Sequence, residues 1–159
     1  MIQFLTPKKL VKYLGLWPPY LFSGISIKEI NPEFTRITSQ LKNHFFSRNY
    51  VGTHFGGSLY SMCDPFYMFI LLEHLSREHI VWDQSATIEF IRPSHDTVTA
   101  TFEISMAEIE NLKLQALSQF KVLPVFETTI TDSQGQVIAK VKKGLYVRRK
   151  DAKQRFQKA

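Results

Sequence analysis

The chain has 159 residues, of which 44% are apolar and 21% charged, and this balance is typical of one globular domain rather than of a disordered segment or a disulfide-stabilised miniprotein. The single cysteine, Cys63, excludes an internal disulfide and a cysteine-rich metal site, and it agrees with a reducing compartment, so we expect a cytoplasmic location. The net charge of +6 is uneven, because residues 140–159 carry nine Lys or Arg and one Asp whereas the rest of the chain sums to −2. A broad nucleic-acid-binding surface is therefore not expected.

The first predicted element is a short amphipathic helix that begins at the Thr6-Pro7 pair, a helix-start signal. The apolar residues that recur at helical spacing, opposite a group of lysines, are Leu10, Val11, Leu14 and Trp17. We expect residues 1–20 to form a helical segment that lies on the domain's own surface, and contact of its basic face with a membrane is the alternative. No apolar stretch reaches the roughly 20 residues of a membrane-spanning helix, and the N-terminus lacks the order of a secretory signal.

Alternating apolar and polar residues predict the strands. Residues 25–30 and 35–41 alternate on either side of an Asn-Pro-Glu turn, which indicates two antiparallel strands. Further strand patterns cover residues 80–91, 97–104, 122–131 and 136–148. Residues 107–120 fit either a short helix or another strand, and residues 150–159 read as a loosely ordered basic tail.

Residues 57–75 form the predicted central element, with apolar side chains over most of its circumference. A helix of this kind must be buried nearly all round, and at 1.5 Å per residue it would be ~28 Å long. The Asp64-Pro65 pair leaves two alternatives open: one helix kinked at Pro65, or a helix that begins at Pro65 with Asp64 as its N-cap. The sequence therefore predicts a single α+β domain, residues 1–159, in which a curved antiparallel sheet of about five or six strands wraps around a long central helix.

Residues 49–64, Asn-Tyr-Val-Gly-Thr-His-Phe-Gly-Gly-Ser-Leu-Tyr-Ser-Met-Cys-Asp, resemble the signature of hotdog-fold acyl-CoA thioesterases of the phenylacetyl-CoA thioesterase type. That signature has an Asn, then His-Gly-Gly beginning six residues on, then an Asp seven residues past the second Gly. Asn49, Gly56, Gly57 and Asp64 match it in type and spacing, whereas Phe55 stands at the His position. The resemblance in element order covers roughly residues 20 to 148, and it implies a hotdog fold and thioester hydrolysis.

The resemblance also implies a role for each matched residue. The backbone N–H of Gly56 would polarise the thioester carbonyl, as free donors at a helix start can. Asp64 would activate water or attack directly, and Asn49 would orient the site. Asp83 falls where some relatives place a water-positioning hydroxyl.

Phe55 and its neighbour His54 depart from the signature. Phe55 cannot donate a hydrogen bond, so whatever the family's His contributes is absent here. His54 comes one residue too early, and we expect a loop or capping role for it rather than catalysis.

The spacing of Gly57 and Asp64 bears on oligomeric state. On one continuous helix, seven residues separate them by ~10 Å along the axis, whereas general-base chemistry needs a reach of about 2.6 to 3.2 Å. One helix could not supply both groups to the same carbonyl, so we expect a homodimer with two equivalent interface sites. Further pairing of dimers into a tetramer is left open.

An acyl-CoA ligand would need partners for its phosphates and for its reacting end. Basic residues near strand ends are candidates for the phosphates, although lysines that discourage edge pairing are an equal explanation. These candidates are Arg92, Lys142, Lys143 and Arg148. Candidates near the reacting end are Phe55, Gly57, Ser61 and Asp83.

The expected function is therefore hydrolysis of an acyl-CoA thioester, with coenzyme A as part of the substrate and no further cofactor. No metal is expected, because no pair of histidines has ligand spacing. A non-catalytic binder of acyl-CoA or a similar amphipathic ligand is the alternative that Phe55 favours. Nucleic-acid binding through the basic tail is a third reading, and it would require strong salt dependence.

Overall fold

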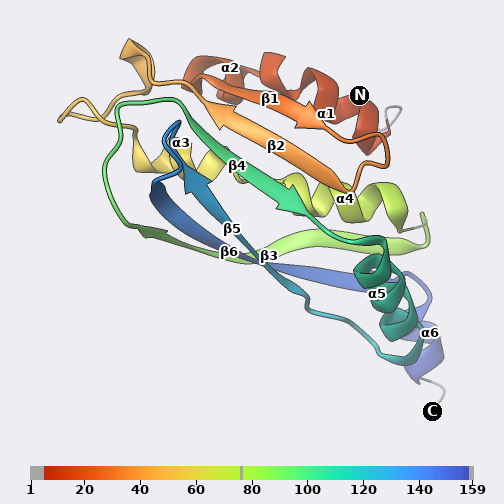
Figure 1. Ribbon diagram of the computed structural model, residues 1–159. Coiled ribbons are helices and arrows are strands. Elements are labelled where there is room, and N and C mark those ends of the chain that lie inside the picture. Colours follow the sequence, from red (N-terminus) through yellow and green to blue (C-terminus); the bar gives the residue numbers. More distant parts are fainter. Residues whose placement is uncertain (1–5, 76, 158–159) are drawn as a thin grey trace.

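The computed structural model describes residues 6–75 and 77–157 and places six strands of this part of the chain in one antiparallel sheet, in the order β1-β2-β4-β5-β6-β3 (Figure 1). The strands are β1 (Ile25–Ile30), β2 (Arg36–Leu41), β3 (His79–Phe90), β4 (Val98–Glu103), β5 (Val125–Thr131) and β6 (Val137–Arg149). Each predicted strand is confirmed to within a few residues. The longest pairing joins β3 to β6, from His79 opposite Arg149 to Phe90 opposite Ala139. Since β3 is the last strand in the order, it forms one edge of the sheet.

The N-terminal segment comprises α1 (Pro7–Tyr13), the short 3-10 helix η1 (Leu14–Leu16) and α2 (Pro18–Ser23). The Thr6 hydroxyl accepts a hydrogen bond from the Lys9 N–H, as the sequence predicts for an N-cap. The segment lies on the domain and packs α1 against the central helix, with Val11 and Tyr20 buried. The second helix, α2, was not expected, and it begins at a proline because a first helical position needs no N–H.

The long central helix of the prediction is two helices, α3 (Gly56–Ser61) and α4 (Phe66–His74). The chain leaves helical geometry after Met62, because Pro65 has no N–H for the carbonyl of Ser61 and because a residue before proline disfavours the helical region. The alternative with Asp64 as N-cap is also wrong, since Pro65 holds the cap position and no side chain caps α4. The prediction of near-complete burial holds best for α4, whose Phe66 and Ile70 are fully buried.

Residues 107–120, which fit a helix or a strand, belong to α5 (Met106–Ser118). Ser105 and Glu108 form a capping box: the Ser105 hydroxyl accepts from the Glu108 N–H, and the Glu108 carboxylate accepts from the Ser105 N–H. This Ser-x-x-Glu pattern is visible in the sequence and would have decided the ambiguity.

The basic tail is more ordered than expected, since Ala152–Gln157 form α6. Asp151 holds its start, because the Asp151 carbonyl accepts from two backbone N–H groups of the first turn and its carboxylate pairs with Arg149 at 3.0 Å. Arg155 donates to the carbonyl of Leu117 at 2.8 Å, which ties α6 to the end of α5.

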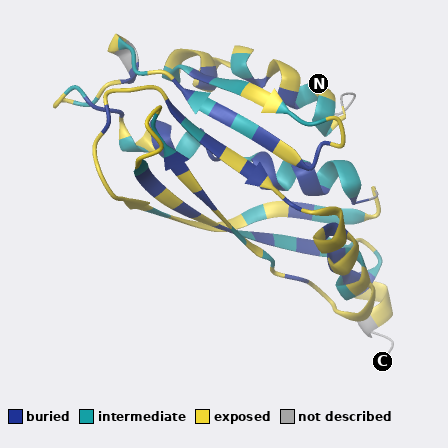
Figure 2. Cartoon of the chain, in the orientation of Figure 1, coloured by how far each residue is buried: buried dark blue, intermediate teal, exposed yellow. Residues whose placement is uncertain are grey.

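The core lies between the curved sheet and α4 (Figure 2). Alternate residues of the central strands are buried in this core, including Ile37 and Leu41 of β2 and Val98 and Phe102 of β4. The last short element is η2 (Phe45–Ser47), in the connection between β2 and α3. Within residues 6–75 and 77–157, none of the helices combines the length and apolar character that crossing a bilayer requires.

Candidate functional site

Strand β6 presents two neighbouring lysines to opposite faces of the sheet. Successive side chains of a strand alternate, so Lys143 shares the inner face with the buried residues Val141 and Leu145, whereas Lys142 points outward. The side chain of Lys143 is only 1% exposed. A buried ammonium must be paired, and its partners define the site.

Three polar side chains surround the Lys143 ammonium. Its Nζ lies 2.6 Å from Oδ1 of Asp64 and 3.2 Å from Oδ1 of Asp83. It also donates to the Tyr60 hydroxyl at 3.2 Å, and it lies 5.2 Å from the centroid of the same ring. We call Asp64, Asp83, Lys143 and Tyr60 the Lys143 cluster. It joins the α3–α4 break to β3 and β6, and two carboxylates share one cation.

The charges of the cluster perturb one another. Burial by itself lowers the pKa of Lys143, but the hydrogen bond and charge of Asp64 and the charge of Asp83 outweigh burial and raise that pKa to about 12. Burial raises the pKa of Asp83, as does the charge of Asp64, and Lys143 opposes this rise. Lys143 is therefore the fixed cation of the cluster, while Asp83 is the carboxyl that resists ionisation.

Asp64 is the member of the cluster that solvent reaches most easily. Its side chain is 43% exposed, compared with 21% for Asp83. The break between α3 and α4 places Asp64 outside either helix, and the Tyr20 hydroxyl donates to its backbone carbonyl and, at 3.0 Å, to that of Ser61. The backbone of Asp64 is thus fixed by the N-terminal segment while its carboxylate faces Lys143 and solvent.

Gly56 and Gly57 open α3, and their N–H groups belong to the first helical turn, which leaves such donors without intrahelical partners. A Cβ at Gly56 would lie 3.0 Å from the ring of Phe90, and a Cβ at Gly57 would lie 2.3 Å from the ring of Phe55. A side chain at Gly57 would require the Phe55 ring to move, and one at Gly56 would press on the Phe90 ring. Phe55 and Phe90 are both more than half exposed, so two aromatic rings flank the helix start.

The Asn49 side chain forms hydrogen bonds within the loop that leads into α3. Its side-chain oxygen accepts from the N–H groups of Val51 and Thr53 at 3.1 Å, and its amide donates to the Thr53 hydroxyl and to the carbonyl of His54. All of these contacts lie within residues 49–54. They shape the approach to Gly56 and do not reach Asp64.

His54 is buried in the same loop, with Nε2 2.6 Å from the carbonyl oxygen of Asp96. Burial lowers its pKa, although the backbone contact with Asp96 opposes this. Cys63 is also buried, and burial raises the pKa of its thiol against the influence of Lys143. The environment of Cys63 is unlike that of a reactive thiolate.

The remaining predicted site residues do not join the Lys143 cluster. The Ser61 hydroxyl donates to the carbonyl of Gly57 at 2.8 Å, within α3. Arg92 is exposed two residues beyond Phe90 and donates to the Gln136 side chain. Arg148 lies 5.4 Å from the ring centroid of Phe120 on the outer face.

The position of Lys143 does not favour the phosphate-binding role expected of it. Its ammonium is buried and paired with two carboxylates, so it cannot meet a phosphate at a solvated strand end. The prediction used only the charge of Lys143. Strand alternation places Lys143 on the same face as Val141 and Leu145, and this was visible in the sequence. Tyr60 and Tyr20 were missed, and no local pattern points to them.

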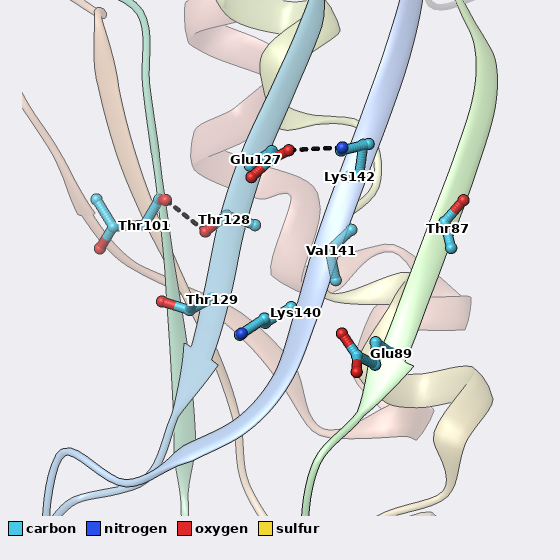
Figure 3. A pocket seen from close by; sticks show the side chains of 9 residues that line it. All are labelled: Thr87, Glu89, Thr101, Glu127, Thr128, Thr129, Lys140, Val141 and Lys142. Carbon is cyan, nitrogen blue, oxygen red and sulfur yellow. Dashed lines mark hydrogen bonds and ion pairs between the residues drawn. The ribbon is translucent and has the colours of Figure 1, made fainter.

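The outer face of the sheet carries a separate hollow of about 810 Å³ (Figure 3). Lys142 pairs there with Glu127 at 2.8 Å, and the Thr128 hydroxyl donates to the carbonyl of Thr101 at 2.7 Å. The hollow is lined by Thr87, Glu89, Thr101, Glu127, Thr128, Thr129, Lys140, Val141 and Lys142. Its one ion pair, between Lys142 and Glu127, is exposed to solvent, so the hollow lacks the buried charges of the Lys143 cluster. In the part of the chain that the structure describes, no group of three His, Cys, Asp or Glu side chains could hold a metal ion.

Comparison with known proteins places these features in a wider context. A family model described as "Domain of unknown function (DUF4442)" matches residues 8–147. No curated protein matches the chain. A Pseudomonas aeruginosa protein of unknown function, described as a probable thioesterase, superposes with a TM-score of 0.80 at 18% identity, over 90% of this chain and 96% of that chain.

Two further solved structures give similar results. A thioesterase from Haemophilus influenzae superposes with a TM-score of 0.66 at 16% identity, over 91% of this chain and 92% of that one. A protein of unknown function from Chlorobaculum tepidum superposes with a TM-score of 0.71 at 16% identity, over 91% and 98%. At these identities the likeness shows the fold, and it confirms the hotdog architecture that the signature implied.

Proposed function

The chain belongs to the DUF4442 family, and we propose that it is a thioesterase in which Asp64 is the catalytic carboxylate. The observation that carries the proposal is the Lys143 cluster, in which a part-exposed carboxylate at a helix break is held by a buried cation. The fold is shared with proteins described as thioesterases, which supports the same reaction class.

In the proposed reaction, Asp64 accepts a proton from a water molecule as the water oxygen bonds to the thioester carbonyl carbon. The carbonyl oxygen becomes negative and is stabilised by the backbone N–H of Gly56. The carbon–sulfur bond then breaks, and the proton passes from Asp64 to the leaving thiolate. Direct attack by Asp64 on the carbonyl carbon, followed by hydrolysis of the resulting anhydride, is the other route.

Lys143 acts in this scheme as a positioning residue. Its 2.6 Å contact fixes the Asp64 carboxylate in one orientation, and its charge compensates the two neighbouring carboxylates. Asp83 supports the same ammonium from β3. The three side chains come from the α3–α4 break, β3 and β6, so their geometry depends on the pairing of β3 with β6.

The edge strand β3 supports a homodimer. An exposed edge strand of 12 residues is a template for pairing with another chain, and Phe90 and Ile91 are exposed at its end. Because α3 and α4 are separate helices, the ~10 Å separation of Gly57 and Asp64 on one continuous helix is no longer a reason to expect a dimer. The features that support a dimer are the edge strand β3 and the exposed Phe55 and Phe90 rings that flank Gly56.

The proposed substrate is an acyl-CoA thioester, used without a further cofactor in the cytoplasm. Arg92 is the one predicted phosphate partner that is both exposed and close in sequence to the ring that covers Gly56. Lys142 and Arg148 lie on the outer face and are not part of this proposal.

A second candidate is a non-catalytic binder of acyl-CoA. Phe55, in place of a histidine, favours it. Saturable binding of acyl-CoA without turnover by the wild type would select this candidate. The Phe55→His variant would then show whether turnover can be gained.

The test compares the wild type with Asp64→Asn on a panel of acyl-CoA thioesters, measuring thiol release. We expect the substitution to lower kcat by about 10²–10⁴-fold, the usual contribution of a general base. Glu33→Gln, in the exposed turn between β1 and β2, is the matched control and should leave kcat unchanged. Turnover that persists at the wild-type rate in Asp64→Asn would overturn the proposal.

A further inference from the structure

The N-terminal helical segment carries a second apolar face that the domain does not cover. Between residues 13 and 22, five large apolar side chains are 50% to 72% exposed. They are Tyr13, Leu16, Trp17, Leu21 and Phe22, and we call them the N-terminal apolar surface. Large exposed apolar patches on globular domains mark interaction sites.

This surface is held in place by the rest of the domain. Val11, Leu14 and Tyr20 of the same segment are buried, and the Tyr20 hydroxyl donates to backbone carbonyls in the α3–α4 connection. Lys8 Nζ donates to the carbonyl of Pro32 at 2.5 Å, which ties α1 to the β1–β2 turn. The exposed apolar side chains are therefore not a frayed end but the outer face of an anchored element.

A hollow of about 400 Å³ opens within this surface, between the N-terminal segment and the start of α4. Its size is within the range of pockets that take an alkyl chain or a similar apolar group. All of its lining residues are apolar or aromatic: Leu10, Tyr13, Leu14, Leu16, Trp17, Pro65 and Phe69.

Positive charge borders the apolar surface. Lys9 and Lys12 are exposed on α1, and Lys9 lies four residues before Tyr13, so the two share one helix face. Residues 1–28 contain four lysines and no Asp or Glu. Glu73 of α4 lies at the start of α1, where its carboxylate accepts from the Lys8 N–H at 3.1 Å, and Glu29 pairs with Arg36. The combination of Trp, Leu and Phe with flanking Lys is typical of elements that lie in a membrane interface.

We propose that the N-terminal apolar surface docks on an anionic lipid surface, with Leu16 and Trp17 in the interfacial layer and Lys9 and Lys12 on the headgroup phosphates. The apolar hollow would accept part of a lipid acyl chain. Docking of this kind does not depend on Asp64 chemistry and holds whether or not the protein is a thioesterase.

A second copy of the chain is a poorer occupant for the same surface. A twofold interface brings the same patch of both protomers together, and it would bring the Lys9 and Lys12 ammonium groups of both copies into one interface. Like charges at an interface are unfavourable, whereas anionic headgroups compensate them.

The experiment measures co-sedimentation of the full chain with vesicles of phosphatidylcholine alone and of phosphatidylcholine mixed with phosphatidylglycerol. We expect binding to the mixed vesicles that weakens with salt. Lys9→Glu with Lys12→Glu should weaken binding by at least about 30-fold, since each basic residue contributes about 1 kcal/mol. Leu16→Ser with Trp17→Ser should weaken it by about tenfold or more, because apolar side chains leave the interface.

Two matched controls carry the same changes elsewhere. Lys150→Glu with Lys153→Glu makes the same charge change at exposed positions of the C-terminal tail, and Leu114→Ser removes an exposed apolar side chain of α5. Both controls should bind as the wild type does. In a Trp82→Phe background, which leaves Trp17 as the only tryptophan, the mixed vesicles should shift Trp17 emission to shorter wavelength.

Three results would overturn the proposal. The first is no binding of the wild type to the mixed vesicles. The second is an equal loss in the tail control, which would mean general charge attraction. The third is unchanged vesicle binding by Leu16→Ser with Trp17→Ser while size-exclusion chromatography shows a smaller species, which would mean that a second copy covers the surface. Thiol-release assays on the same variants keep this proposal separate from the enzymatic one.

Discussion

The two faces of β6 carry neighbouring lysines in opposite situations. Lys142 is 58% exposed on the outer face and pairs with Glu127 at 2.8 Å, and Glu127 is itself exposed. Lys143 is 1% exposed on the inner face and lies at 2.6 Å from Asp64. The two ion pairs have similar lengths, so the difference between them lies in their surroundings.

Exposure to water decides what each pair contributes. An exposed pair is screened and contributes about 0–1 kcal/mol, whereas removing one partner of a buried pair leaves a desolvated charge at a cost of about 3–5 kcal/mol. A buried ion pair on the inner face of a sheet also carries a desolvation cost, and well-packed apolar side chains in its place are often as stable or more stable. The presence of a lysine at position 143 therefore fits a role in the chemistry of Asp64 better than a role in stability.

The largest expected effect is that of Lys143→Met. It leaves Asp64 and Asp83 without their cation, and we expect a loss of about 1–3 kcal/mol in the free energy of unfolding, less than for a fully buried pair because the Asp64 side chain is 43% exposed. For a domain of this size that loss corresponds to a fall in Tm of roughly 2–12 °C. Differential scanning calorimetry measures it directly. A fall no larger than that of Lys142→Met would mean that the inner pair is not effectively buried.

The second effect is the pH dependence of Asp83→Asn. Burial raises the pKa of Asp83, so its contribution to stability is complete below the ordinary value near 3.8 and is lost as the pH rises through the raised value. Asparagine does not titrate, so this variant should gain Tm relative to the wild type at pH 8 and gain less at pH 4. Thermal scans at the two pH values check the sign. A variant that loses more Tm at pH 8 than at pH 4 would contradict this account of Asp83.

The smallest effect is that of Lys142→Met on the outer face. We expect its free energy of unfolding to change by less than about 1 kcal/mol, because Lys142 and Glu127 are both exposed. High salt should remove even that difference, since exposed charges are screened. Urea unfolding of the variant at low salt and at 1 M NaCl, with the wild type in parallel, measures both quantities, and a larger or salt-insensitive change would remove the contrast between the two faces.

The sequence predicted the sheet well because strand alternation is a local pattern. It did not decide between a kink and a break in the central element, because Leu59, Met62, Phe66 and Ile70 keep helical spacing across it. Both helices turn the same side to the core, so apolar periodicity cannot reveal the interruption. Only Pro65 marked the break, and proline is compatible with a kink as well as with an end.

The site was harder to predict than the fold. Asp64 was predicted from its motif and Asp83 from a weaker spacing argument, and their roles in the reaction stay predictions. Their convergence on Lys143 depends on the register of β3 against β6, in which Ala86 lies opposite Lys143, and no local pattern gives that register. The roles of Gly56 and Asn49 stay predictions, because they depend on a bound substrate and on a second protomer.

The most direct measurement of the central claim, that Lys143 acts on catalysis through Asp64, is kcat for four proteins: the wild type, Asp64→Asn, Lys143→Met and the variant with both substitutions. Residues that act as a unit are not additive, so once Asp64 is lost the loss of Lys143 should cost nothing more, and the double variant should match Asp64→Asn. Losses that multiply, or an Asp64→Asn enzyme as fast as the wild type, would contradict the claim.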